Sequence, residues 1–266
     1  MKFARVLTHN RAAKRTTVAF GIAGAVSGML VGCEEKPMNE KSNVSQAPSP
    51  SSGSLHDTLS ARYEQYQQKV DDETKRIYKA GIEAVAASGV LERATNEGDT
   101  APGFTLPNAD GESVSLESML DDGPIVLVWY RGGWCPYCNL TLRAFSEILP
   151  QIESAGAQLV AISPELPDNT AETVTENGLE FTVLSDVGNA VAKQYGVVFG
   201  LTPEVHAKYN AAFGFDAHNG QDSGELPLAA TYVIDREGVV RYAFMDADYT
   251  KRAEPNVVLD AVKALP

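Results

Sequence analysis

PIVLVWYRGGWCPYC, residues 124–138, is the stretch of this chain from which the architecture can be inferred. Its first seven residues are apolar, β-branched or aromatic without interruption, and such a short run predicts a fully buried β-strand. Pro136 indicates that a helix starts at this point, because proline lacks the N–H that a first helical turn would leave unpaired. Cys135 and Cys138 are therefore expected where a buried strand passes into a helix.

The start of a helix is a position that activates a cysteine. Unpaired backbone N–H groups and the positive end of the helix dipole favour the thiolate, which is the nucleophilic form of the side chain. In Cys-x-x-Cys motifs the thiol pKa falls from about 8.5 to roughly 3.5–7.5, and Arg131 is close enough in sequence to lower it further. The spacing also lets both sulfurs close a disulfide. We predict a redox site, with Trp134, Pro136 and Tyr137 lining a pocket that admits a small peroxide or a partner thiol.

A zinc site and a purely structural disulfide are the alternatives for this cysteine pair. Zinc needs four ligands, and the sequence has no second Cys-x-x-Cys motif. His206 and His218 are the candidates to complete such a site, and both lie in residues 199–225, the longest irregular segment that the sequence predicts. A segment of this length is either functional or an ordered excursion. We assign no metal ligands.

Strand-like and helix-like segments alternate along the chain after the motif. Apolar and β-branched runs predict further strands at residues 157–163, 181–184, 230–234 and 239–244. Helical spacing of apolar residues predicts helices at residues 140–154, 171–176, 190–195 and 257–265. This order predicts an α/β fold with a central, partly parallel sheet that helices cover on both faces and that a hairpin at residues 236–238 closes.

Composition and charge narrow the classes of function. The chain has 266 residues, of which 44% are hydrophobic and 21% charged, as expected for a globular protein with one large domain. Five of its 22 lysines and arginines lie in residues 1–32, which contain no acidic residue, so the other 234 residues carry 17 basic against 35 acidic groups. A body with a net charge of −18 repels phosphate backbones. Nucleic acid is therefore not an expected partner.

Residues 1–32 have the anatomy of an export signal. A basic start is followed by an apolar run of about 16 residues, shorter than the ~20 that cross a bilayer as a helix. The ending Leu30-Val31-Gly32-Cys33 resembles the lipobox of bacterial lipoproteins, in which the cysteine thiol is acylated. We expect Cys33 to anchor the protein on the periplasmic side of the bacterial cell envelope, and Glu34 favours the outer membrane. An uncleaved anchor helix and a secreted protein cleaved elsewhere are the alternatives.

Two segments separate this signal from the main domain, which we expect at residues 96–266. Residues 33–54 are polar and rich in Pro, Ser and Gly, and they predict a flexible tether. Residues 55–95 place apolar side chains at helical intervals and predict a helical extension of one or two helices, interrupted at Gly81 and Gly89. The apolar stripe of this extension packs either on the following domain or on a second copy of the chain, which would form a homodimer.

Three motifs within residues 96–266 carry a resemblance to one known family. Residues 98–104 (GDTAPGF), 130–138 (YRGGWCPYC) and 230–235 (ATYVID) resemble the alkyl hydroperoxide reductase and thiol-specific antioxidant family, most closely its peroxiredoxin-like members with Cys-x-x-Cys. The resemblance implies a thioredoxin-like fold with a central mixed sheet flanked by helices. It also implies a thiol-dependent peroxidase that needs no cofactor, acts on a small hydroperoxide and is re-reduced by a dithiol protein or a small thiol.

The resemblance assigns roles to individual residues and shows where this chain departs from the family. Cys138 takes the place of the peroxidatic cysteine, Cys135 that of a Thr three residues earlier and Arg131 that of a Pro seven residues earlier. Ala229 stands where the family has an arginine that stabilises the charge developing as the O–O bond breaks, so slower peroxide reduction is expected unless Arg131 substitutes for it. Pro227 is the nearest candidate for the cis-proline of thioredoxin-like reductases.

Two enzymatic mechanisms remain open at this point. In the first, the Cys138 thiolate attacks a hydroperoxide and becomes a sulfenic acid, which Cys135 resolves as a disulfide. In the second, Cys135, the more exposed member of thioredoxin-like motifs, attacks a disulfide of an envelope protein and Cys138 resolves the mixed disulfide. A non-enzymatic role in copper delivery is a third reading, although the exported chaperones of that kind have a cysteine spacing one residue longer.

Overall fold

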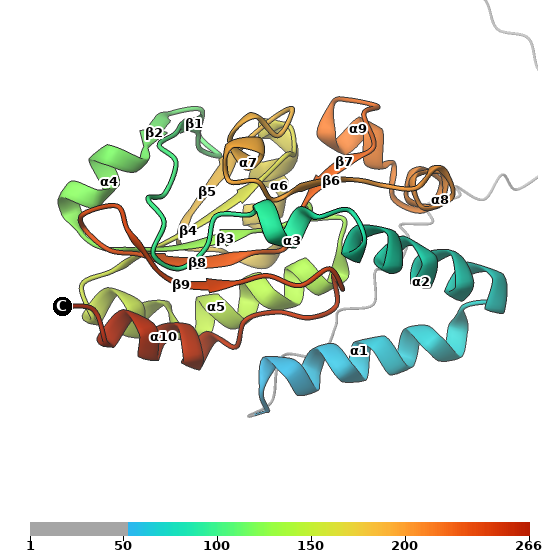
Figure 1. The fold of residues 1–266 in the computed structure, drawn as a ribbon, viewed down its shortest axis with the longest axis horizontal. Coiled ribbons are helices and arrows are strands. Elements are labelled where there is room, and N and C mark those ends of the chain that lie inside the picture. The colour runs from blue at the N-terminus through green and yellow to red at the C-terminus, as the bar shows by residue number, and fades with distance from the viewer. Residues whose placement is uncertain (1–52) are drawn as a thin grey trace, which may run out of the picture. The chain divides into compact units, whose positions relative to one another are not determined.

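A mixed β-sheet forms the centre of residues 53–266, the part of the chain that this computed structural model describes (Figure 1). Within those residues its five strands lie in the order β5-β4-β3-β8-β9. Their bounds are β3 Ile125–Trp129, β4 Gln158–Ser163, β5 Thr182–Ser185, β8 Thr231–Ile234 and β9 Val240–Phe244. Strands β3, β4 and β5 are parallel, whereas β8 is antiparallel to both β3 and β9. The expected partly parallel sheet and its closing hairpin are confirmed.

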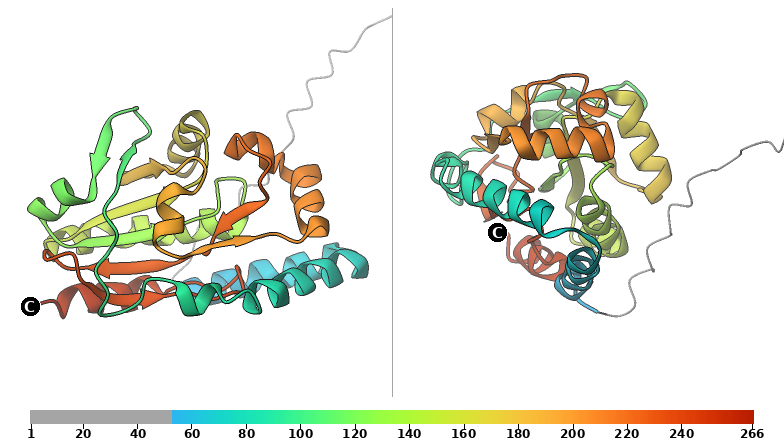
Figure 2. Two further views of the ribbon diagram at one scale, coloured as in Figure 1. Left: turned by 45° about the horizontal axis from the view of Figure 1, so that its top comes forward. Right: turned by 90° about the vertical axis from the view of Figure 1, so that its right-hand side faces the viewer.

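Helices cover both faces of this sheet, as Figures 1 and 2 show. The helices of the described residues are α1 Leu55–Lys69, α2 Asp72–Ala86, α3 Val90–Arg93, α4 Leu116–Asp122, α5 Pro136–Ser154, α6 Pro167–Asn177, α7 Ala190–Gln194, α8 Pro203–Phe213, α9 Phe215–Asn219 and α10 Pro255–Lys263. Successive strand residues point to opposite faces, so Val126 and Val128 pack with α1, α5 and α10. Ile125, Leu127 and Trp129 pack with the cluster that contains side chains of α2, α4, α7 and α8.

Two small antiparallel sheets flank the central one. They pair β1 Thr105–Pro107 with β2 Ser113–Ser115, and β6 Val198–Gly200 with β7 Glu225–Pro227. The segment expected to be irregular, residues 199–225, proves to be an ordered excursion, because it contains α8 and α9 between β6 and β7. Helix α8 has a recognisable start in the sequence: the Thr202 hydroxyl caps it and Pro203 is its first residue.

The N-terminal extension consists of α1, α2 and the short α3, and it packs on the domain of the same chain. Helix α2 begins after its N-cap residue, Asp71. The interruption expected at Gly81 does not occur, since Gly81 lies inside α2 where a Cβ would be only 2.7 Å from Cγ2 of Val205 on α8. A glycine at this position thus allows the two helices to approach closely. Leu55 and Leu59 are buried in the cluster around α5. The homodimer stays a prediction.

Residues 1–52 lie outside the described part of the chain. The predicted signal at residues 1–32, the lipidated Cys33 and nearly all of the tether at residues 33–54 therefore have no structural account here. Among the helices of residues 53–266, none combines the length and apolar character that crossing a bilayer requires.

Candidate active site

Cys135 and Cys138 lie at the start of α5, as the sequence predicts. Cys135 is the N-cap residue, Pro136 is the first helical residue and Cys138 belongs to the first turn. Both cysteines are free thiols, and each residue is only 1% exposed. The expectation that Cys135 is the more exposed of the two is wrong, because both pack in one apolar cluster with Tyr130 and Tyr137.

Arg131 is a buried cation beside Cys135. The residue is 2% exposed, and its Nη1 lies 3.8 Å from Cys135 Sγ. Its guanidinium carbon lies 5.0 Å from the ring centroid of Trp134, 4.8 Å from that of Tyr209 and 4.4 Å from that of Tyr249. Within residues 53–266, no carboxylate oxygen lies within 4.0 Å of this guanidinium. A buried charge is costly unless an anion compensates it, and the thiolate form of Cys135 supplies that anion.

A second guanidinium, that of Arg252, reaches the other sulfur. Its Nη2 lies 3.6 Å from Cys138 Sγ, which also accepts the backbone N–H of Arg131 at 3.5 Å. Arg252 has no local signal in the sequence, because it is 114 positions from Cys138 and belongs to no motif. The available signal was the loss of the family's arginine at Ala229, which leaves a need for a cation from elsewhere in the chain.

The two sulfurs differ in acidity. Burial by itself raises the pKa of a thiol. At Cys135 burial is outweighed by the hydrogen bond from the Cys138 thiol and by the charges of Arg131 and Arg252, which lower the Cys135 pKa to about 5. At Cys138, burial, the hydrogen bond to Cys135 and the negative charge on Cys135 raise the pKa. These effects favour ionisation of Cys135 over ionisation of Cys138.

Aromatic side chains enclose the cysteine pair. Tyr137 is buried and packs edge-on against Tyr249, with ring centroids 5.6 Å apart. Trp134 is half-buried, and its ring centroid lies 5.6 Å from that of Phe215 in α9. Pro136 is half-buried at the first position of α5. These three predicted pocket residues lie at the site, but Trp134 packs against the excursion at residues 199–225 rather than forming a free rim.

A pocket opens beside Arg131. Its mainly apolar walls come from α2, α8 and the β6–β7 pair, and they include Ile82 and Val205. Pro227 and Ala229 also line it. The prediction of a cis-proline at Pro227 is wrong: within residues 53–266 every peptide bond is trans, and Pro227 pairs with β6 at the end of β7 instead. Pro227 is thus a wall residue of the pocket.

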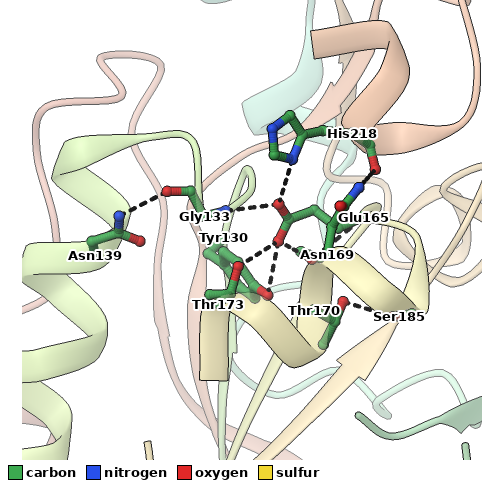
Figure 3. Close-up of polar contacts among 10 residues, drawn as sticks. Tyr130, Gly133, Asn139, Glu165, Asn169, Thr170, Thr173, Ser185 and His218 are labelled. Carbon is green, nitrogen blue, oxygen red and sulfur yellow. Dashed lines mark hydrogen bonds and ion pairs between the residues drawn. The ribbon is translucent and has the colours of Figure 1, made fainter. Parts of the chain in front are cut away.

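A buried carboxylate, that of Glu165, holds the loop that precedes the cysteines (Figure 3). Its Oε1 accepts the N–H of Gly133 at 2.9 Å, and its Oε2 accepts the hydroxyl groups of Tyr130 at 3.2 Å and Thr173 at 3.3 Å. The Gly133 carbonyl accepts Nδ2 of Asn139, on α5, at 2.7 Å. Hydrogen bonds therefore hold both the N–H and the carbonyl group of Gly133. Glu165 has no local signal in the sequence, since the residue follows β4 in a stretch without a motif.

His206 and His218, considered above as metal ligands, contact carboxylates. His206 Nε2 lies 2.6 Å from Asp216 Oδ1. His218 Nδ1 lies 3.6 Å from Glu165 Oε1, and this carboxylate raises the pKa of His218 (Figure 3). In the part of the chain that the structure describes, no three His, Cys, Asp or Glu side chains gather as a metal site.

The strand order, the helices on both faces and a cysteine pair opening the helix after the central strand define a thioredoxin-like protein. A model of the AhpC/TSA family matches residues 98–243, more than half of the chain. This chain therefore belongs to the AhpC/TSA family, as the resemblance of its motifs implies. Arg252 lies outside the matched residues.

Individual relatives support the same assignment. Peroxiredoxin Q, chloroplastic, of Triticum aestivum is 31% identical over 159 residues, which are 60% of this chain and 63% of that protein. The protein of the same name from Sedum lineare is 32% identical over 148 residues, 56% of this chain and 68% of that protein. The chain spans about three fifths of the length of the first curated relatives that it matches.

Solved structures support the fold. The crystal structure of peroxidoxin BcpB from Mycobacterium tuberculosis has a TM-score of 0.52 at 24% identity and covers 65% of this chain and 99% of that chain. A peroxiredoxin-like protein from Aquifex aeolicus has a TM-score of 0.51 at 22% identity, with 64% and 96% covered. The expected thioredoxin-like fold, a central mixed sheet flanked by helices, is confirmed.

Proposed function

We propose that this chain is a thiol peroxidase that reduces hydroperoxides through a dithiol/disulfide cycle of Cys135 and Cys138. The observation that carries the proposal is that two free thiols meet two buried guanidinium groups at the start of one helix. Membership of the AhpC/TSA family supports a hydroperoxide as the oxidant, since relatives with about 30% identity bear the name peroxiredoxin. A reducing dithiol protein or a small thiol completes the cycle.

The electrostatics of the pair favour Cys135 as the attacking sulfur, the reverse of the role expected from the motif alignment. In the first step the Cys135 thiolate attacks one oxygen of the hydroperoxide. The S–O bond forms, the O–O bond breaks, and the leaving oxygen takes up a proton to give an alcohol or water. Arg131 lies beside Cys135 and is placed to stabilise the charge that moves onto the leaving oxygen.

Cys138 acts in the second step. Its sulfur attacks the sulfur of the Cys135 sulfenic acid, so that the S–S bond forms as the S–O bond breaks. The departing hydroxide and the proton of the Cys138 thiol combine to water. One hydroperoxide and two thiols thus yield a disulfide, one alcohol or water molecule and one water. An external dithiol or two small thiols then reduce the disulfide by exchange.

Single cysteine variants test this assignment. With hydrogen peroxide and a dithiol reductant, Cys135→Ser is expected to abolish peroxide consumption, because the variant lacks the proposed attacking sulfur. Without the reductant, Cys138→Ser should react with one equivalent of peroxide and stop at a sulfenic acid on Cys135, which dimedone traps and mass spectrometry locates. Sulfenic acid on Cys138 of the Cys135→Ser variant, formed at the wild-type rate, would reverse the two roles. A wild-type protein that leaves peroxide unconsumed would refute the peroxidase.

Thiol–disulfide exchange with envelope proteins is a second candidate, and the low pKa of Cys135 favours it. In this reaction the Cys135 thiolate attacks a substrate disulfide, and Cys138 releases the reduced substrate by attacking the mixed disulfide. The same wild-type preparation distinguishes the two functions. Rapid reduction of insulin disulfides without consumption of peroxide would select exchange over the peroxidase.

We also propose that the protein is anchored in the bacterial cell envelope through lipidated Cys33. The support is the sequence Leu30-Val31-Gly32-Cys33, which follows a basic start and an apolar run. Cys33→Ser is expected to remove labelling by a clickable fatty acid and to shift the protein from the membrane to the soluble fraction of lysed cells. Equal fatty-acid labelling of the two forms would contradict the anchor.

A further inference from the structure

Arg252 has the contacts of a catalytic group, although the family motifs do not include it. The residue is 9% exposed. Its Nη1 donates to the carbonyl oxygens of Tyr249 and Lys251, the latter at 2.7 Å. This arrangement leaves Nη2 directed at Cys138 Sγ, 3.6 Å away. Within residues 53–266, no carboxylate oxygen lies within 4.0 Å of the guanidinium, so its charge is available to the cysteine pair.

The segment that carries Arg252 is held in shape by its own hydrogen bonds. Asp248 accepts the backbone N–H of Thr250 at 3.0 Å and its hydroxyl at 2.8 Å. The neighbouring Tyr249 ring lies against the guanidinium of Arg131, which joins this segment to the other half of the site. A side chain positioned in this way needs little reorganisation when charge develops beside it. Ala229, just before β8, has no guanidinium. Arg252, in the segment after β9, supplies a cation instead.

The two guanidinium groups are divided between the two sulfurs. Arg131 Nη1 contacts Cys135, and Arg252 Nη2 contacts Cys138. While Cys135 is an anion, its charge opposes a second negative charge on Cys138. This repulsion ends when Cys135 becomes a neutral sulfenic acid. Arg252 then lies beside Cys138 with no neighbouring anion to oppose ionisation of the Cys138 thiol. The geometry therefore suits a cation that acts after the peroxide has reacted.

We propose that Arg252 is a catalytic residue of the resolving step, in which it stabilises the Cys138 thiolate that attacks the Cys135 sulfenic acid. The proton released from Cys138 and the hydroxide displaced from Cys135 form water, so that no further reactant is needed. This inference rests on the proposed peroxidase cycle. It gives the two buried arginines different main roles: Arg131, beside Cys135, serves the attack on peroxide. Arg252, beside Cys138, serves disulfide formation in addition to its smaller effect on the Cys135 pKa.

Rapid-mixing kinetics of Arg252→Gln test the inference. After reduced protein is mixed with hydrogen peroxide, sulfenic acid should form at a rate within a few-fold of wild type. Disulfide formation should slow by about 10- to 100-fold, the size expected when a cation is removed from beside an anion. The sulfenic acid that accumulates should be trapped by dimedone and should overoxidise to the sulfinic acid at lower peroxide concentrations than in wild type. Arg252→Lys, which keeps the charge, should recover most of the resolving rate.

Controls separate catalysis from folding and from the proposed function. Lys251→Gln removes a neighbouring exposed cation and should leave both steps at wild-type rates. In a Cys138→Ser background, adding Arg252→Gln should change the rate of sulfenic acid formation by no more than a few-fold. The inference is overturned if Arg252→Gln slows only the attack, if both steps keep wild-type rates, or if Gln and Lys variants lose the resolving rate and thermal stability equally. A wild-type protein that does not consume peroxide would overturn the proposed function and, with it, this inference.

Discussion

Arg131→Met is expected to lower the rate constant for the reaction of Cys135 with hydrogen peroxide at pH 7 by about 100-fold. Burial raises the pKa of the Cys135 thiol, and Cys138, Arg131 and Arg252 together bring it down to about 5, so the native thiol is almost entirely ionised at pH 7. Without the Arg131 cation 3.8 Å away, the pKa of Cys135 rises and a smaller fraction of the sulfur is ionised at pH 7. The leaving oxygen also loses the cation proposed to stabilise it. Methionine is the chosen replacement because it is flexible and apolar and can fill the space between the rings.

The pH dependence of alkylation by iodoacetamide measures this effect without peroxide. Only the thiolate reacts, so the wild-type rate should be constant well above pH 5 and should fall by half near the Cys135 pKa of about 5. In Arg131→Met the midpoint should move to higher pH. Arg143→Met is the matched control, because Arg143 lies on the same helix and its Nε contacts Asn177 instead of a sulfur. An unchanged midpoint in Arg131→Met would show that Arg252 and the helix start suffice to ionise Cys135.

Gly133→Ala is expected to destabilise the protein by about 2–3 kcal/mol, the upper part of the range for inserting a methyl group into a closely packed position. A Cβ at this position would be 2.1 Å from Thr173 Oγ1 and 3.1 Å from Thr173 Cβ. The loop cannot easily shift away, because Glu165 holds the Gly133 N–H and Asn139 holds its carbonyl. Thr173 is itself buried on α6 and β-branched, so it has little freedom to rotate. Denaturant unfolding of the reduced protein measures the loss of stability.

A double variant tests whether the contact with Thr173 causes the destabilisation of Gly133→Ala. Thr173→Ala alone removes a hydrogen bond to Glu165 and should cost about 1 kcal/mol. In Gly133→Ala/Thr173→Ala the nearest clash is gone, so the double variant should be more stable than Gly133→Ala alone, a non-additivity typical of contacting residues. Gly103→Ala is the matched control, since a Cβ there meets nothing within 4 Å, and its stability should stay near wild type. Strictly additive effects of the two substitutions would rule out the contact with Thr173 as the source of destabilisation.

Much of the fold could be predicted because its signals are local. Every residue of β3 is buried, as its uninterrupted apolar run indicates, and α5 starts at Pro136, as a proline in a first turn indicates. Local signals predicted the wrong structure where a contact with a residue distant in sequence determined it. Gly81 looks like a helix interruption, yet α2 continues through it because the close approach of Val205 favours a residue without a side chain. Thr202 and Pro203 are a helix-start signal in the sequence, although the segment that contains them has the pattern of an irregular one.

The same distinction between local signals and distant contacts applies to the residues of the candidate site. Neighbouring residues along the chain were enough to place two cysteines at a helix start behind a buried strand, since strand runs, helix starts and motif spacing each depend on a few adjacent positions. Which charges surround the sulfurs depends instead on how separate segments pack. Arg252 lies 114 positions from Cys138, and Glu165 lies 32 positions from Gly133. No periodicity links such pairs, because their proximity arises only when the sheet and its covering helices have assembled.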